Sequence, residues 1–265
     1  MTRPLWIARA VLGELRVALM LAVQYRASFL GEALMAVLWV PYTLLPLFVV
    51  YGREQGLAGW TRDEALLVLG FWTTLEGLLS AFVSPNLSAV VEQVRSGSFD
   101  FVLLKPVDPQ LLVSVHRTDP TQLPHALVGL LLVGFAAGRL PTPPGPQDWL
   151  LGALLLGCGV VILHALWTVV VATAFWFVRV DNLSALLNAL VDAGRWPIQV
   201  YPQAVRFVFK FVLPVGLMTT WPAMALRRLL DPGQVLLALA VTLGFLLLGR
   251  AVWRLALRHY ASASS

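Results

Sequence analysis

The chain has 265 residues, of which 58% are hydrophobic and 12% are charged, and its mean hydropathy is +0.78. Soluble domains carry about 25% charged and about 45–50% apolar residues, so this composition excludes an ordinary soluble domain and indicates a polytopic membrane protein. The net charge of +5 comes from basic residues scattered between apolar runs, which favours acidic lipid headgroups over nucleic acid as the anionic neighbour. The single cysteine excludes an intrachain disulfide.

Long apolar stretches predict an all-α fold with six transmembrane helices, because about 20 mainly apolar residues are needed to cross the hydrocarbon layer. We expect residues 1–265 to form one transmembrane domain. The fifth span is the hardest to delimit, since charges and prolines interrupt the apolar region from 183 to 221. The six predicted spans cover residues 27–51, 65–83, 122–138, 149–178, 199–218 and 234–255.

Segments outside these spans also carry recognisable patterns. Residues 3–24 have Trp and Leu on one helical face and Arg on the other, which predicts an amphipathic helix in the membrane interface. A second interfacial helix is expected at residues 183–194. Residues 219–231 are expected to re-enter the membrane from the outer side without crossing it. Asp231 and Pro232 then supply an N-cap and a first-turn proline for the last span. The sequence Thr61-Arg62-Asp63-Glu64 has the spacing of a capping box at the start of the second span.

The Lys and Arg distribution predicts the orientation, because basic residues accumulate in cytoplasmic loops. With the N-terminus inside, most of the 19 basic residues fall on the cytoplasmic side. We therefore expect a multi-pass protein of the cell (plasma) membrane with both termini in the cytoplasm.

The largest cytoplasmic loop, residues 84–121, is the most informative stretch. A short amphipathic helix begins at Ser84-Pro85, and Gly97 can end it by adopting the left-handed C-cap conformation. An apolar run and the sequence Leu-Leu-Lys-Pro follow. A short amphipathic helix closed in this way is suited to docking a partner protein.

The stretch from Val91 to Val107 resembles the loop after the second span in type-two ABC exporter permeases. That pattern is Arg-x-Gly, an apolar-Asp pair and then Leu-Leu-Lys-Pro. A second match is the Trp-Pro-Ile-Gln-Val-Tyr-Pro run at 196–202, with later prolines in Phe-Val-Leu-Pro and Thr-Trp-Pro-Ala. Together these are similar to the branch of small six-span permeases that work beside a separately encoded ATPase. Trp196 departs from the Tyr or Phe expected there.

The resemblance implies a permease subunit that forms half of the translocation path of an ATP-driven exporter. It also implies a coupling helix after the second span and two kinds of partner: two ATPase subunits, and a second permease that is identical or a sister chain. The residues it assigns to ATPase coupling are Glu92, Arg95, Gly97, Asp100, Leu104, Lys105 and Pro106. The residues it assigns to the broken fifth region are Pro197, Tyr201, Pro202, Pro214 and Pro222.

The sequence lacks the Gly-x-x-x-x-Gly-Lys-Ser/Thr loop that cradles nucleotide phosphates, so we expect no enzyme activity and no cofactor in this chain. ATP and Mg would be used by the partner ATPase. The four histidines of this chain show no metal-ligand spacing.

Ionisable residues inside the predicted spans are candidates for function because they are costly in lipid. Glu76 either lines the path or forms a hydrogen bond that packs two helices. Arg206 and Lys210 share a face near the cytoplasmic end of the fifth span, where they either reach lipid phosphate or rim the entry for an anionic substrate. His164 is expected to bond a neighbouring helix. A basic stripe predicted to anchor anionic lipid consists of Arg250, Arg254 and Arg258.

Two other classes of protein share some of these features. A non-ATP-driven channel or membrane scaffold subunit would have the same spans but no ATPase partner. A membrane-embedded lipid enzyme would need acidic or His residues clustered near one membrane face, and the sequence shows no such cluster.

Overall fold

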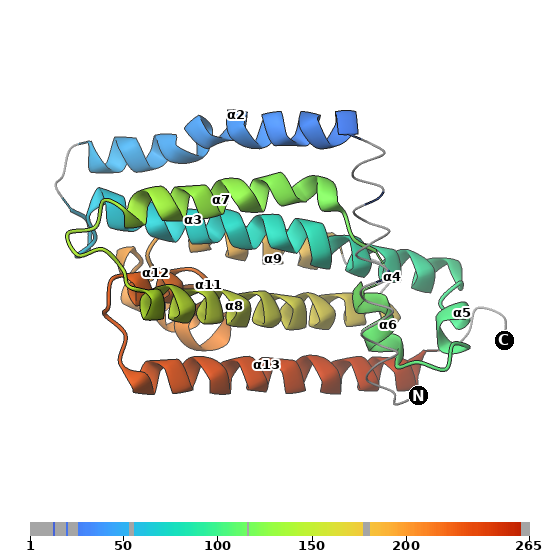
Figure 1. The fold of residues 1–265 in the computed structure, drawn as a ribbon. Coiled ribbons are helices and arrows are strands. Elements are labelled where there is room, and N and C mark those ends of the chain that lie inside the picture. The colour runs from blue at the N-terminus through green and yellow to red at the C-terminus, as the bar shows by residue number, and fades with distance from the viewer. Residues whose placement is uncertain are drawn as a thin grey trace.

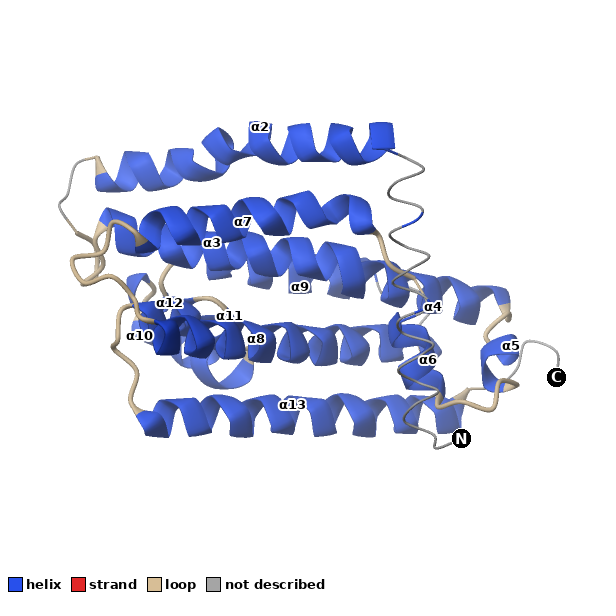
Figure 2. Ribbon diagram, in the orientation of Figure 1, coloured by secondary structure: helices blue, strands red, loops and turns tan. Residues whose placement is uncertain are grey.

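In a computed structural model of the chain, residues 26–52, 56–115, 117–176 and 181–260 are described, together with the isolated positions Gly13 and Met20. These parts are helical, apart from connecting loops and one β-bridge between Leu57 and Trp60 (Figure 2). The all-α prediction is therefore confirmed. The interfacial helix predicted at 3–24 lies outside the described residues, apart from those two positions.

Long helices lie side by side along one common direction (Figure 1). Among the described residues, five helical runs have the length and apolar composition needed to cross a bilayer. The chain is thus a polytopic membrane protein. The long helices of these runs are α2 (Arg26–Tyr51), α3 (Arg62–Leu78), α7 (Leu123–Ala137), α8 (Pro146–Ala172) and α13 (Pro232–His259).

The two ends of the bundle differ in what they carry (Figure 1). We call one the α5 end; it carries the short helices α4 (Ser84–Ser96), α5 (Asp100–Leu103) and α6 (Pro109–Val115). We call the other the Trp60 end, because Trp60 lies there just before α3 begins.

Two of the long helices begin with the caps that their sequences predict. At the start of α3, the Glu64 backbone N–H donates to the Thr61 hydroxyl (3.4 Å) and the Thr61 N–H donates to the Glu64 carboxylate (2.7 Å). At the start of α13, the Asp231 carboxylate accepts the Gln234 N–H at 2.9 Å, and Pro232 occupies the first turn. These bonds satisfy amide groups that have no partner within the helix.

Helix α3 does not end after the length of one span but continues through a π-helical turn, η1 (Leu79–Val83), into α4. The continuous run Arg62–Ser96 has 35 residues and is about 52 Å long, well beyond the roughly 30 Å of hydrocarbon. Pro85 has no N–H for the Ala81 carbonyl, and the Asp119 N–H takes that place at 2.8 Å. The predicted span and coupling helix are therefore one rod.

Helices α3 and α7 pack closely through residues with little or no side chain. A β-carbon placed on Gly77 would lie 2.3 Å from the Ala126 backbone nitrogen, and one on Gly129 would lie 2.4 Å from the Thr74 nitrogen. Glycines allow membrane helices to approach closely where the hydrophobic effect gives no driving force. We refer to this contact as the glycine seam.

Residues 199–218, the predicted fifth span, do not form one continuous helix, because Leu213 and Pro214 interrupt it. A helix is present close to the predicted 183–194, but it packs against the long helices and not apart from them in an interface. Helix α9 (Asp181–Asp192) packs against the bundle through Leu187 and Val191, and the Val191 carbonyl accepts the indole N–H of Trp72 at 2.9 Å. After the 3₁₀ turns η4 (Ala193–Arg195) and η5 (Ile198–Val200), Gln199 accepts the Trp60 indole N–H at 3.1 Å. The chain therefore rises to the Trp60 end over residues 191–199.

Residues 203–226 then form a helical hairpin that enters the bundle from the Trp60 end and returns to it. One arm is α10 (Gln203–Phe207) with the π-turn η6 (Val208–Val212); the other is α11 (Val215–Met218) with α12 (Thr220–Leu226). Met218 lies against Gly159 halfway along α8, whereas Leu226 lies against Gly152 near its start. The re-entrant segment predicted at 219–231 thus begins earlier. Prolines 202 and 214 stand at the start of each arm, and arms of about 15–18 Å are too short to cross.

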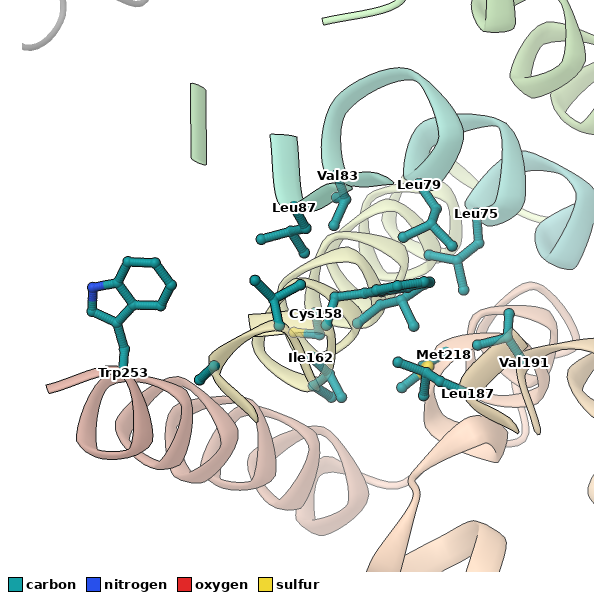
Figure 3. Close-up of a cluster of buried hydrophobic side chains, with 14 of the residues drawn as sticks. Leu75, Leu79, Val83, Leu87, Cys158, Ile162, Leu187, Val191, Met218 and Trp253 are labelled. Carbon is teal, nitrogen blue, oxygen red and sulfur yellow. The ribbon is translucent and has the colours of Figure 1, made fainter. Parts of the chain in front are cut away.

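Helix α8 passes through the largest buried apolar cluster (Figure 3). Cys158 and Ile162 of α8 lie between residues of the α3–α4 rod on one side and residues of α9 and α11 on the other. The cluster therefore holds the rod, the rising segment and the hairpin together. Its labelled members in the close-up are Leu75, Leu79, Val83, Leu87, Cys158, Ile162, Leu187, Val191, Met218 and Trp253.

Candidate functional site

The α3–α4 rod ends in a sharp reversal at the α5 end. Gly97 has φ 74° and ψ 0°, the left-handed conformation predicted for it, and its N–H donates to the Val94 carbonyl at 3.3 Å. The Phe99 N–H then donates to the Gln93 carbonyl at 3.1 Å. A side chain at position 97 would be strained, because left-handed backbone costs L-residues roughly 1–2 kcal/mol.

Most residues assigned to ATPase coupling are at the surface of this end. Beside them is an apolar patch, the coupling tip, formed by Phe101, Leu103 and Leu104, whose exposed fractions are 69%, 41% and 79%. Exposed apolar patches rimmed by charges mark protein interaction sites. Phe101 and Leu103 were missed by the sequence analysis. Of the assigned residues, Gly97 and Asp100 are half-buried, and Glu92, Arg95, Leu104, Lys105 and Pro106 are exposed.

A cluster of four aromatic rings connects the coupling tip to the bundle. Phe99, which is fully buried, lies edge-on to Phe175 (5.3 Å between centroids), Tyr260 (5.5 Å) and Trp253 (6.2 Å). Phe175 ends the α8 segment, and the other two rings stand at the end of α13. Burial, with the Asp100 carboxylate nearby, raises the pKa of the Tyr260 phenol. Each such ring pair contributes about 0.5–1.5 kcal/mol beyond its burial.

Helix α6 is fastened to the same two long helices by polar contacts. The Arg250 guanidinium of α13 donates to both oxygens of the Asp108 carboxylate, at 2.9 Å for Nη1 to Oδ1, and to the Gln110 side-chain oxygen at 2.8 Å. Ser114 lies 3.2 Å from Nε2 of His164 in α8, which fits the expected interhelical bond. The prediction that Arg250 anchors lipid is therefore wrong, because its guanidinium is engaged by Asp108.

The Asp108–Arg250 pair predicts a pH-dependent stability. Hydrogen bonds from Arg250, with smaller contributions from two backbone N–H groups, hold the pKa of the Asp108 carboxyl below its usual range. A depressed carboxyl pKa stabilises the fold above about pH 4, and this contribution is lost as pH falls through the lowered value. At pH 7 we expect Asp108→Asn, which keeps a helix cap, to lower the unfolding free energy by about 1 kcal/mol.

Thermal unfolding in detergent from pH 7 down to pH 3 measures this effect. The gap between wild type and Asp108→Asn should shrink below about pH 4, as the wild-type carboxyl becomes protonated. A gap that stays constant over the whole range would show that the charge of Asp108 does not stabilise the fold.

The path candidate Glu76 is bonded across the glycine seam. Its carboxylate lies 2.9 Å from Nε2 of His125 in α7, and the two side chains are 39% and 27% exposed, respectively. The interhelical bond weighed for Glu76 is thus present, with a partner that the sequence analysis did not single out. The partial exposure of an ionisable pair in the bundle leaves the path role as a prediction.

The other path or gate candidates lie in or beside the hairpin. Tyr201 donates its hydroxyl to the Ala193 carbonyl at 2.7 Å and meets Phe209 edge-on at 5.1 Å. Arg206 donates to the carbonyls of Gln199 and Tyr201, both at 3.1 Å. Arg206 is therefore at the Trp60 end, opposite the end that carries the predicted coupling loop, because its segment runs in the opposite direction to the predicted span. Pro197, Pro202 and Pro214 precede short helical elements, Lys210 lies within η6, and Pro222 is buried in α12.

Two consecutive arginines fasten the far end of the hairpin, which the sequence analysis did not foresee. Arg227 lies 2.8 Å from the Glu64 carboxylate, with both side chains largely buried, and stacks over the Trp60 ring at 4.3 Å. Arg228 lies 2.7 Å from the Asp148 carboxylate at the start of α8. The hairpin is thus tied to the first turns of α3 and α8.

Comparison with known families identifies the group to which the chain belongs. The sequence profile of the ABC-2 family transporter proteins matches residues 36–264, nearly the whole chain. The chain therefore belongs to the ABC-2 family and is a membrane (permease) component of an ABC transporter, not itself a catalytic enzyme. Permeases of this family generally work with ATPase subunits. Searches of curated proteins and of solved structures find no match.

Proposed function

Taking membership of the ABC-2 family as the premise, we propose that this chain forms half of the translocation path of an ATP-driven exporter. A second permease, identical or a sister chain, supplies the other half, and two separately encoded ATPase subunits use ATP and Mg. The observation that carries the proposal is the coupling tip: exposed apolar residues at the α5 end, directly joined to the buried aromatic cluster.

The contacts suggest how force from the ATPase pair would travel. Closure of the ATPases would push on the coupling tip and on the α4 end of the rod. The aromatic cluster and the Asp108–Arg250 pair would pass that displacement to α8 and α13 as well as to α3. Since only differential affinity shifts a two-state equilibrium, ATP binding in the partner supplies the energy and this chain supplies the element that changes state.

At the other end, the hairpin would act as the gate. Its two arms meet the bundle at half depth, and the Arg227 and Arg228 ion pairs hold it against α3 and α8. A rearrangement of α8 would change the surface against which both Met218 and Leu226 pack. With both termini in the cytoplasm, the α5 end faces the ATPases and the hairpin faces outward.

Co-expression with ABC-type ATPases from the same genome tests the proposal. An affinity tag on the permease should capture the ATPase in a stoichiometric complex, and reconstitution of that complex should give ATP-dependent export. A permease that purifies without an ATPase and conducts passively would instead identify a channel or scaffold subunit.

Gly97→Val should reduce ATP hydrolysis that depends on the permease by about tenfold in the reconstituted complex. The β-branched side chain cannot readily adopt φ 74°, so the reversal would open and displace the coupling tip. Gly97→Asn is the matched control, because Asn tolerates left-handed backbone and should retain most of the stimulation. Equal activity of both variants, with normal expression, would remove Gly97 from the coupling element.

A further inference from the structure

A cavity of about 210 Å³ lies between α4, α5 and α6, beside the coupling tip. Its volume far exceeds the roughly 10–15 Å³ that one water needs. Val90, Val102 and Leu112 contribute apolar walls, each from a different segment of the chain. The space is therefore large enough, and mixed enough in chemistry, for part of an amphiphilic ligand.

Two cations line this cavity and no acidic side chain does, among the described lining residues. Lys105 follows α5 and Arg117 follows α6, so the chain brings them to the space from separate segments. In the described part of the chain, neither side chain has an ion-pair partner. Two positive charges without a counter-charge favour an anion, and the forked guanidinium suits phosphate oxygens.

Gln93 adds an unpaired polar group to the same cavity. Its side-chain oxygen is buried, and no hydrogen-bond partner for it exists among the described residues. The oxygen and nitrogen of an amide can be exchanged by rotation, so this group can either accept from a ligand hydroxyl or donate to a phosphate oxygen. A buried amide without a protein partner is costly, so a ligand group that bonds it would be favoured.

The depth of the cavity indicates the source of the anion. Counted from Arg62, the roughly 20 residues that cross the hydrocarbon end near residue 82. Asn86, the first lining residue of the rod, lies about 6 Å beyond that point, at the level of the lipid headgroups, and Gln93 lies about 16 Å beyond it. The cavity therefore begins at headgroup level and extends away from the hydrocarbon. Anionic headgroups are concentrated on the cytoplasmic leaflet, the side expected for the α5 end.

We propose that this cavity binds the phosphate headgroup of an anionic phospholipid. Lys105 and Arg117 hold the phosphate, the Gln93 amide bonds its oxygens or glycerol hydroxyls, and the apolar walls receive the first carbons of the lipid. Bound lipid would brace α4, α5 and α6 against one another. The apolar walls favour lipid over free phosphate as the occupant.

Binding is measured on the purified permease alone, so a failure of ATPase coupling has no influence on the result. The probes are short-chain phosphatidylglycerol, short-chain phosphatidylcholine and inorganic phosphate, each titrated against intrinsic tryptophan fluorescence and counted by native mass spectrometry. We expect saturable phosphatidylglycerol binding that Lys105→Gln/Arg117→Gln weakens about thirtyfold, from about 1 kcal/mol per basic residue. Arg254→Gln/Arg258→Gln is the control for surface attraction, since it removes two exposed cations of the same end that lie outside the cavity and belong to the stripe predicted to contact anionic lipid at the surface. It should weaken saturable binding much less than the cavity variant.

The charge-preserving exchange Lys105→Arg/Arg117→Lys, which should bind within about threefold of wild type, checks that any loss reflects charge and not misfolding. An equal loss in the Arg254/Arg258 control would mean diffuse surface attraction and overturn the site. Inorganic phosphate binding as tightly as phosphatidylglycerol, or phosphatidylcholine binding equally well, would overturn the anionic-lipid assignment.

Discussion

Gly77→Ala and Gly129→Ala are each expected to lower the unfolding free energy by about 2–3 kcal/mol. The added methyl group would meet backbone nitrogen atoms at 2.3 Å and 2.4 Å, respectively, so α3 and α7 would have to separate. Separation would also stretch the Glu76–His125 bond, which joins the same two helices at 2.9 Å. Because Ala favours an isolated helix by about 1 kcal/mol over Gly, the loss would arise entirely from packing.

Thermal unfolding in detergent, followed by tryptophan fluorescence, measures this loss. Gly134→Ala is the matched control, because it lies in the same helix α7 and its added methyl group would meet nothing within 4 Å. It should be neutral or slightly stabilising. If the seam variants and Gly134→Ala unfold at the same temperature, the close approach of α3 and α7 is not what stabilises this pair.

The sequence predicted the helix caps and the backbone conformation of Gly97, because these depend only on neighbouring residues. The cap at Thr61, the cap at Asp231 and the left-handed Gly97 each follow from a few adjacent residue types, and each is present. Hydropathy also predicted the membrane class, since it depends on composition alone. In contrast, hydropathy does not show whether an apolar segment continues across the bundle or turns back, so it could not predict the path of residues 199–218. Pro214 turns the chain back at half depth, so two short arms have the composition of one span.

The candidate site shows the same division. The coupling residues form a contiguous motif and could be assigned by resemblance. The residues that hold this segment against the bundle are distant from it in the sequence. Phe99 meets Tyr260, and Asp108 meets Arg250, only after the whole chain has folded. No periodicity or spacing in a single sequence links such pairs. Arg250 is an example: its spacing with Arg254 and Arg258 predicts contact with lipid, but in the folded chain its guanidinium pairs with Asp108.

Phe99→Ala is expected to abolish most of the ATP-driven transport while the ATPase still binds. Removing this fully buried ring leaves a cavity at the centre of the aromatic cluster, and buried Phe→Ala changes cost about 3–5 kcal/mol. The coupling tip would then move without displacing α8 or α13. We expect ATP hydrolysis that no longer responds to the permease, and at least a tenfold loss of transport, in the reconstituted complex.

Phe101→Ala is the control that separates anchoring from docking, because Phe101 is only two residues away but 69% exposed. It should unfold like wild type, since little packing is lost, yet it should weaken capture of the ATPase. Phe99→Leu, which refills part of the cavity, should recover part of the stability and part of the coupling together. If Phe99→Ala lost ATPase binding and Phe101→Ala did not, the docking surface would have to be reassigned from the exposed tip to the cluster behind it.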